Sequence, residues 1–139
     1  MPSVFTRIID GELPGHFVWK DREAVAFLTI APIRDGHVLV VPRQEVDQWD
    51  DLPAAGNAHL MRVSQCIARA IKREFGCARA ALMIAGFEIP HVHLHVIPAD
   101  SMADLSFARA VPAPAERLRE IATRMRAALL SDGNVEAEF

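Results

Sequence analysis

Three of the six histidines in this chain stand at alternate positions in one short stretch, "HVHLHVIP", at residues 91–98. In an extended strand, successive side chains point to opposite faces of the sheet. His91, His93 and His95 therefore share one face, about 7 Å apart per step, while the apolar residues between them face the core. Imidazole changes charge near neutral pH and serves both as a nucleophile and as a metal ligand. The spacing thus predicts a row of chemically active side chains.

Residue chemistry leaves three interpretations of this row. Histidines at alternate strand positions can converge on one metal ion, which would make the protein a histidine-bound metalloprotein. The row can instead be a catalytic face, where one imidazole attacks and a neighbour supplies or accepts a proton. The third interpretation, a polar strand face that happens to contain histidine, is disfavoured by the strict alternation of an uncommon residue. His37, after the turn "IRDG", is a candidate fourth imidazole, although by position alone a surface turn histidine is the more ordinary interpretation.

Five runs rich in β-branched and apolar residues predict the strands that must hold the row in place. They lie at 16–20, 24–30, 37–42, 80–86 and 91–98. The first two read as a hairpin, and Pro42 closes the third because proline cannot donate to a strand ladder. Short links join the first three strands to one another and the last two strands to each other, which is typical of a mainly antiparallel sheet.

Two amphipathic segments predict helices. The longer covers roughly 52–75, where Asp51 can cap it, Pro53 fits its first turn and Gly76 can end it. The second runs from about 112 to 130. The order of three strands, a helix, two strands and a helix predicts an α+β fold with a five-stranded sheet, one long central helix and a C-terminal helix.

Composition and charge narrow the classes of partner. The net charge is −3 at pH 7, and acidic and basic residues are mixed, which argues against a nucleic acid polymer as partner. No apolar run is long enough to span a membrane, and the first residues lack an apolar signal core, so we expect a cytoplasmic protein without a membrane partner. Cys66 and Cys77 form neither a disulfide framework nor a CxxC pair.

The histidine row lies within a longer pattern that resembles a known family. "HVHLHVIP" resembles the H-φ-H-φ-H-φ-φ signature of the histidine triad (HIT) family of nucleotide hydrolases and transferases. The stretches "FTRIIDGELP" (5–14) and "AVAFLTIAPIRDGHVLVVPR" (24–43) resemble two further family segments, in the family's order. The resemblance implies a single HIT domain over residues 1–139, with a family-like core at 1–98 and a branch-specific loop and helix at 99–139. It also implies a homodimer joined across a two-fold axis.

The resemblance further implies a reaction on a purine nucleotide derivative with a P–N or P–O–P linkage. His93 would attack the α-phosphate, form a nucleotidyl–imidazole intermediate and expel the leaving group, after which water would release a nucleoside monophosphate. His95 and His37 would contact the phosphate or the leaving group, and His91 would orient the row. No cofactor is implied. The residues that would bind the nucleotide are Phe5, Ile8, Phe27, Thr29, Ile30 and Glu88.

Some positions depart from the family pattern. Many bacterial members carry a zinc site built from an N-terminal C-x-x-C and later histidines. Ser3, Thr6 and Glu45 stand at three of those ligand positions, so we expect no zinc here. The family's ribose-binding aspartate falls at Thr29, and a neutral hydroxyl accepts hydrogen bonds more weakly than a carboxylate.

Glu88 takes the place of a Ser/Thr in the shortened segment "IAGFEIP" (84–90) before the row. It would be a general acid if burial raised its pKa, or a structural residue if it pointed away. Alternation from His91 places Ile89 on the catalytic face and Glu88 on the other, which favours the structural role. An altered segment at this point leaves a second function open, a HIT-fold nucleotide-binding protein with little turnover.

Overall fold

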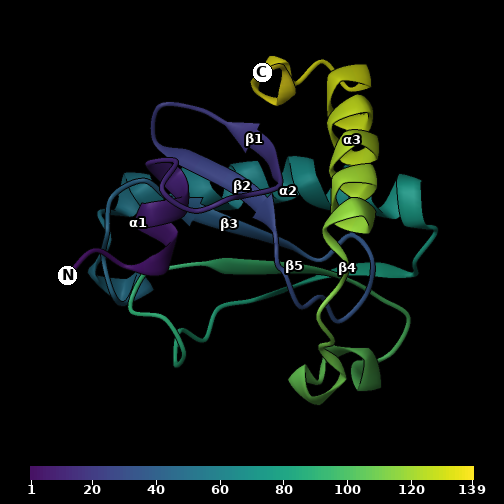
Figure 1. The fold of residues 1–139 in the computed structure, drawn as a ribbon, viewed down its shortest axis with the longest axis horizontal. Helices are drawn as coiled ribbons and strands as arrows, with labels where there is room; N and C mark the ends of the chain where they lie inside the picture. Colours follow the sequence, from purple (N-terminus) through teal and green to yellow (C-terminus); the bar gives the residue numbers. More distant parts are fainter.

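The fold is built on one five-stranded antiparallel sheet in the computed structural model, which describes all residues from Met1 to Phe139 (Figure 1). Its strand order is β1-β2-β3-β5-β4, and every neighbouring pair is antiparallel. The expected α+β class and antiparallel five-stranded sheet are therefore confirmed. The strands are β1 (Phe17–Lys20), β2 (Ala24–Leu28), β3 (Val38–Pro42), β4 (Arg79–Met83) and β5 (Leu94–Ala99).

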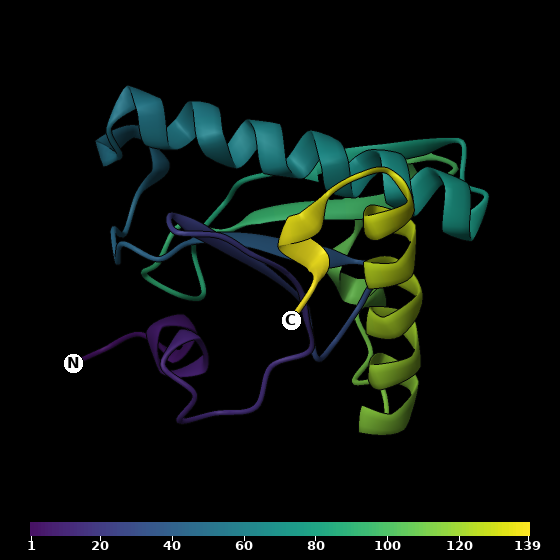
Figure 2. The same ribbon diagram turned by 90° about the horizontal axis from the view of Figure 1, so that it is seen from above.

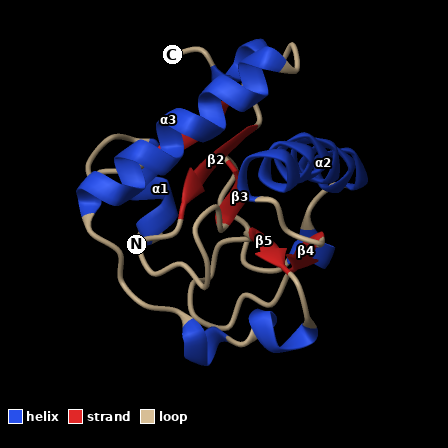
Figure 3. Ribbon diagram, turned by 90° about the vertical axis from the view of Figure 1, so that its right-hand side faces the viewer, coloured by secondary structure: helices blue, strands red, loops and turns tan.

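Three helices flank the sheet: α1 (Val4–Ile9), α2 (Ala54–Phe75) and α3 (Ala115–Ser131). Figure 2 shows α2 and α1 on opposite sides of the sheet. In Figure 3, α2 and α3 lie together over one side, and two short helical turns lie beyond the other. These turns, Met102–Leu105 and Phe107–Arg109, belong to the connection between β5 and α3. None of the helices has the length and apolar character needed to cross a lipid bilayer.

The main core fills the space between the sheet and the two long helices. Val92, Leu94 and Val96 belong to it, as the alternation predicted, and they share it with Ile67 of α2 and Met125 of α3. Burying an aliphatic side chain of this size contributes about 1.5–3 kcal/mol to the stability of the folded state, so the packing on this face stabilises the sheet. A smaller cluster lies on the opposite face, where the side chains of the histidine row also point. It consists of Phe5, Val25, Phe27, Leu39 and Val41.

Several predicted boundaries were wrong. Asp51 does not cap α2: it lies in a 3-10 turn, Trp49–Asp51, and Pro53 takes the N-cap position without a side-chain bond. Gly76 does end α2, since its φ of 59° is the left-handed conformation that glycine adopts most easily. The strand expected at 91–98 begins only at Leu94, because the backbone before it bonds elsewhere: the N–H of Val92 donates to Val46.

Helix α1 was not expected from periodicity, since it has only six residues. It begins at Ser3, whose side chain accepts a hydrogen bond from the backbone N–H of Thr6. Such a cap satisfies one of the otherwise unpaired donors of a helix N-terminus. The helix brings the buried ring of Phe5 onto the histidine side of the sheet.

Candidate active site

A cavity of about 410 Å³ opens on the histidine side of the sheet. Its walls come from α1, the segment after β2, the segment before β5 and the connection between β5 and α3. Of its 19 lining residues 11 are hydrophobic, so the cavity suits an apolar or aromatic group held beside a few polar ones.

The structure brings nearly all of the predicted site residues to this one cavity. The residues that line it are Phe5, Ile8, Phe27, Thr29, Ile30, His37, Glu88, His93 and His95. His91 does not line it. The row is also less open than a half-exposed strand face would be, because the four histidines are at most 8% exposed.

A pair of hydrogen bonds fixes the protons of His37 and His95. The backbone N–H of Ile33 donates to Nδ1 of His37 at 3.1 Å, so the proton of the neutral His37 ring is on Nε2. That nitrogen lies 2.9 Å from Nδ1 of His95 and donates to it. The proton of His95 is therefore on its own Nε2.

Both rings of this pair are neutral near pH 7. Burial, together with His95, lowers the pKa of His37 to about 3. Burial and then His93 lower the pKa of His95 to about 4, although the carboxylate of Glu88 acts in the opposite direction. A buried cation without an anionic partner is unfavourable, which is the physical reason for both shifts.

His93 is held by the backbone of its own segment. Its Nδ1 lies 2.7 Å from the carbonyl oxygen of His91, and because a carbonyl only accepts, Nδ1 carries the proton. Nε2 of His93 then holds the free electron pair. Nε2 of His93 and Nε2 of His95 form no hydrogen bond within the protein. They are not fully enclosed either, since the one enclosed polar side-chain atom without a partner is Ser64 Oγ. Both nitrogens are therefore accessible from the cavity, where the first can act as a nucleophile and the second as a hydrogen-bond donor.

His91 is fixed by two bonds of its own. Its Nε2 donates to the carbonyl of Pro42 at 2.8 Å, and its Nδ1 lies 2.6 Å from Oγ of Ser3, which donates to it. Burial lowers the pKa of His91, so the ring stays neutral. Thr6 and Glu45 complete this cluster: Oε1 of Glu45 accepts from Oγ1 of Thr6 at 2.6 Å and from the backbone N–H of Ser3 at 2.7 Å.

Four aromatic rings stand in a line along the cavity. Phe5, His93, His95 and Phe107 follow one another with ring centroids 4.9 Å apart at each step, all edge to face. The rings of His93, just before β5, and His95, within it, are therefore in direct edge-to-face contact. No sequence pattern predicts a role for Phe107, because it is a single aromatic residue in an irregular segment without periodicity.

The expected alternation before the row does not hold. Glu88 and Ile89 both line the cavity, since residues 84–93 form no strand and do not alternate between faces. The Glu88 side chain is exposed, and its charge acts on His95. The argument that placed Glu88 away from the catalytic face was therefore wrong, while its assignment to the nucleotide site stays a prediction.

Comparison with known proteins agrees with this geometry. The model of the HIT domain matches residues 10–102, which is well over half of the chain. The chain belongs to the HIT family. The uncharacterized HIT-like protein Rv1262c of Mycobacterium tuberculosis is 32% identical over 99% of both chains. The adenosine 5′-monophosphoramidase HNT1 of Saccharomyces cerevisiae is 30% identical over 68% of this chain and 61% of its own.

A solved HIT structure is similar over nearly the whole chain. The zinc-bound histidine triad family protein from Mycobacterium smegmatis superposes with a TM-score of 0.80 at 29% identity, covering 96% of both chains. A zinc ion does not suit the residues of the present chain. The cluster of Ser3, Thr6, Glu45 and His91 offers no thiolate, and both nitrogens of His91 are already in hydrogen bonds. More generally, no group of three or more His, Cys, Asp or Glu side chains is arranged to hold a metal ion.

Proposed function

We propose that this HIT-family protein hydrolyses a purine nucleotide derivative at its α-phosphate, with His93 as the nucleophile. The observation that carries the proposal is the proton arrangement of the row. His93 directs an unprotonated nitrogen to the cavity, and His95 directs an N–H to it. A nucleophile beside a hydrogen-bond donor is what attack on a phosphate requires, because negative charge grows on the phosphoryl oxygens.

In the first step, Nε2 of His93 forms a bond to the α-phosphorus while the P–N or P–O bond to the leaving group breaks. The leaving group takes up a proton from water. The His93 ring becomes cationic, and its Nδ1–H stays on the carbonyl of His91, a bond that strengthens as the charge develops. The N–H of His95 donates to a phosphoryl oxygen. In the second step, water attacks the phosphorus, the P–N bond to His93 breaks and a proton returns to solvent.

The apolar part of the cavity is the place we propose for the base. Phe5 and Phe27 meet edge to face at 5.5 Å, and Ile8 and Ile30 add aliphatic surface beside them. Thr29 would contact the ribose. Its Oγ1 already accepts from the backbone N–H of Ala31 at 3.2 Å, so its hydroxyl proton is the group it can offer to a sugar oxygen.

The test is hydrolysis of adenosine 5′-phosphoramidate by the purified protein, followed by chromatography of the adenosine monophosphate produced. We expect turnover by the natural chain and loss of at least about 10³-fold in both His93→Ala and His93→Asn, as for removal of a nucleophile. The second variant keeps a polar side chain, which matters because the ring is buried. Adenosine monophosphate should still bind to both.

Two results would change this proposal. Binding of adenosine monophosphate without measurable turnover by the natural chain would favour the alternative, a nucleotide-binding protein with little catalytic activity. Turnover by the His93 variants near that of the natural chain would remove the covalent mechanism. Circular dichroism of each variant separates a chemical loss from a failure to fold.

A further inference from the structure

The segment that joins β5 to α3 forms one wall of the cavity. We call residues 100–113 the strap. Two backbone bonds dock its end beside the segment after β2: Ala113 donates to Ile30 at 3.0 Å, and Val111 donates to Pro32 at 3.3 Å. Within the strap, Phe107 and Ala110 line the cavity. The strap thus contributes to the site even though it lies outside the histidine signature.

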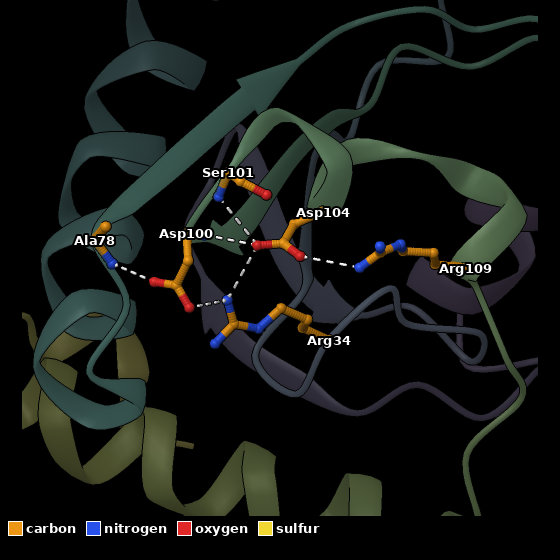
Figure 4. A network of polar contacts seen from close by, with 6 residues as sticks. All are labelled: Arg34, Ala78, Asp100, Ser101, Asp104 and Arg109. Carbon is orange, nitrogen blue, oxygen red and sulfur yellow. Dashed lines mark hydrogen bonds and ion pairs between the residues drawn. The ribbon is translucent and has the colours of Figure 1, made fainter.

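A network of charged groups holds the start of the strap (Figure 4). The carboxylate of Asp104 accepts from the backbone N–H groups of Asp100 at 2.8 Å and Ser101 at 3.2 Å. It also pairs with Arg109 at 3.1 Å and with Arg34 at 3.7 Å. The backbone bond from Asp100, with the further bonds and the two arginines, lowers the pKa of Asp104. A single exposed ion pair contributes little to stability, but several bonds to the carboxylate of Asp104 together hold the turn that leads to Phe107.

The same network reaches the paired imidazoles. Arg34 pairs with Asp100 at 3.1 Å, and its backbone carbonyl accepts from the N–H of His37. The preceding residue, Ile33, supplies the N–H that fixes the tautomer of His37. The turn at 33–37 therefore connects the strap with the His37–His95 pair and holds the strap in a defined position beside these two rings.

Phe107 occupies the space at the His95 end of the cavity. Its ring lies 4.9 Å from the ring of His95 and 6.4 Å from that of His37. Its side chain is 39% exposed, so one part of the ring packs on the imidazoles while the rest borders the open side of the cavity. At the other end of the ring line stands Phe5, in the apolar part assigned above to the base.

We infer that Phe107 is a specificity-determining residue that limits the size of the leaving group. This inference rests on the proposed function. With the base near Phe5 and the phosphate in the cavity, facing Nε2 of His93 and Nε2 of His95, a leaving group that extends past His95 meets Phe107. A fixed aromatic ring there admits a small leaving group, such as ammonia, and excludes a bulky one.

The test compares two substrates that differ only in the leaving group, adenosine 5′-phosphoramidate and its N-benzyl derivative. We expect Phe107→Ala to raise kcat/KM for the benzyl substrate relative to the unsubstituted one by about tenfold, since added room for a few carbon atoms in a pocket has effects of this order. Asp104→Asn should produce part of the same change, because it weakens the pairs with Arg34 and Arg109 and loosens the strap. Met102→Ala is the matched control, since this strap side chain is 81% exposed and does not line the cavity.

Equal changes for the two substrates in Phe107→Ala, or a selective loss of the benzyl substrate, would overturn the inference. Should the natural chain cleave neither substrate, the proposed function fails, and the inference is then tested by binding alone. Calorimetry in the His93→Ala background, with and without Phe107→Ala, compares the affinities for the same two compounds. Tighter binding of the benzyl compound alone in the Phe107→Ala variant would support a limit set by Phe107, and an unchanged ratio of the two affinities would contradict it.

Discussion

Oγ of Ser3 lies 2.6 Å from Nδ1 of His91, although 88 positions separate the two residues in the chain. This bond ties the start of α1 to the histidine row. Through it, the helix that carries Phe5 is joined to His91, whose backbone carbonyl accepts the hydrogen bond from Nδ1 of His93. Ser3, Thr6 and Glu45, which cluster beside His91, stand at three positions that the family resemblance assigns to the zinc ligands of many bacterial members.

The first prediction is that the protein is stable without metal. Purified protein should contain no stoichiometric zinc, and a chelator should not lower its Tm, because the hydroxyl groups of Ser3 and Thr6 are poor substitutes for the two thiolates of such a zinc site. Elemental analysis and thermal unfolding with and without chelator measure both. One zinc per chain, lost together with stability, would contradict the prediction.

A positive control for that experiment is the variant Ser3→Cys, Thr6→Cys, Glu45→His. It places two thiols and a second imidazole around Nδ1 of His91, whose Nε2 already donates to the carbonyl of Pro42 as a zinc-binding histidine requires. We expect this variant to bind one zinc per chain and to gain Tm when zinc is added.

The second prediction concerns Glu88, whose exposed carboxylate lines the cavity. Glu88→Gln should tighten the binding of adenosine monophosphate by about two- to fivefold at low salt, since it removes a repulsive charge near the phosphate, and added salt should reduce the gain. Turnover of adenosine 5′-phosphoramidate should stay within a few-fold. Calorimetry and kinetics at two ionic strengths measure these effects. A loss of about 10²-fold, restricted to poor leaving groups, would instead make Glu88 a general acid.

The third prediction concerns stability and pH. In the unfolded chain His37 and His95 titrate near 6.5, but in the folded protein their pKa values are lowered to about 3 and about 4. The unfolded state therefore binds more protons below pH 6.5, and stability must fall as the pH falls toward 4. Between pH 6.5 and 5 the loss is up to about 2 kcal/mol per histidine.

Urea unfolding at pH 7, 6 and 5 measures this slope. His37→Gln should show a smaller loss across the same range, because glutamine can still accept the N–H of Ile33 but does not titrate. Equal slopes in the natural chain and the variant would show that His37 is not held neutral by burial.

The fourth prediction concerns assembly. β4 stands at the end of the sheet, so one of its edges has no partner strand. Leu82 of β4 is 39% exposed and Met61 of α2 is 52% exposed, and the two line one shallow hollow. We expect a homodimer through this surface, measured by light scattering at micromolar concentration. Leu82→Lys should shift it to monomer, whereas Leu130→Lys, at a similarly exposed position on α3, should not. A monomer of the natural chain would contradict the prediction.

The sequence by itself determined the sheet, the two long helices and the histidine row, while the other residues that line the cavity were named through the resemblance to the HIT family. The sheet, the helices and the row follow from local patterns: alternation in "HVHLHVIP" placed Val92 and Leu94 in the core, and β-branched runs marked the strands. Local patterns do not extend through irregular backbone, so the start of β5, the cap of α2 and the orientation of Glu88 were predicted incorrectly. Proline at position 90 and the bond from Val92 to Val46 interrupt the alternation there.

Only the tertiary structure decided how the imidazoles are protonated and what closes the site. The tautomers of His91 and His95 depend on partners from other segments: Ser3 and Pro42 for His91, and His37 for His95. Phe107 reaches His95 through a strap held by charged pairs between distant residues. Hydrogen-bond direction and ring packing are properties of the groups that meet in space, and no spacing in the chain encodes which groups those are.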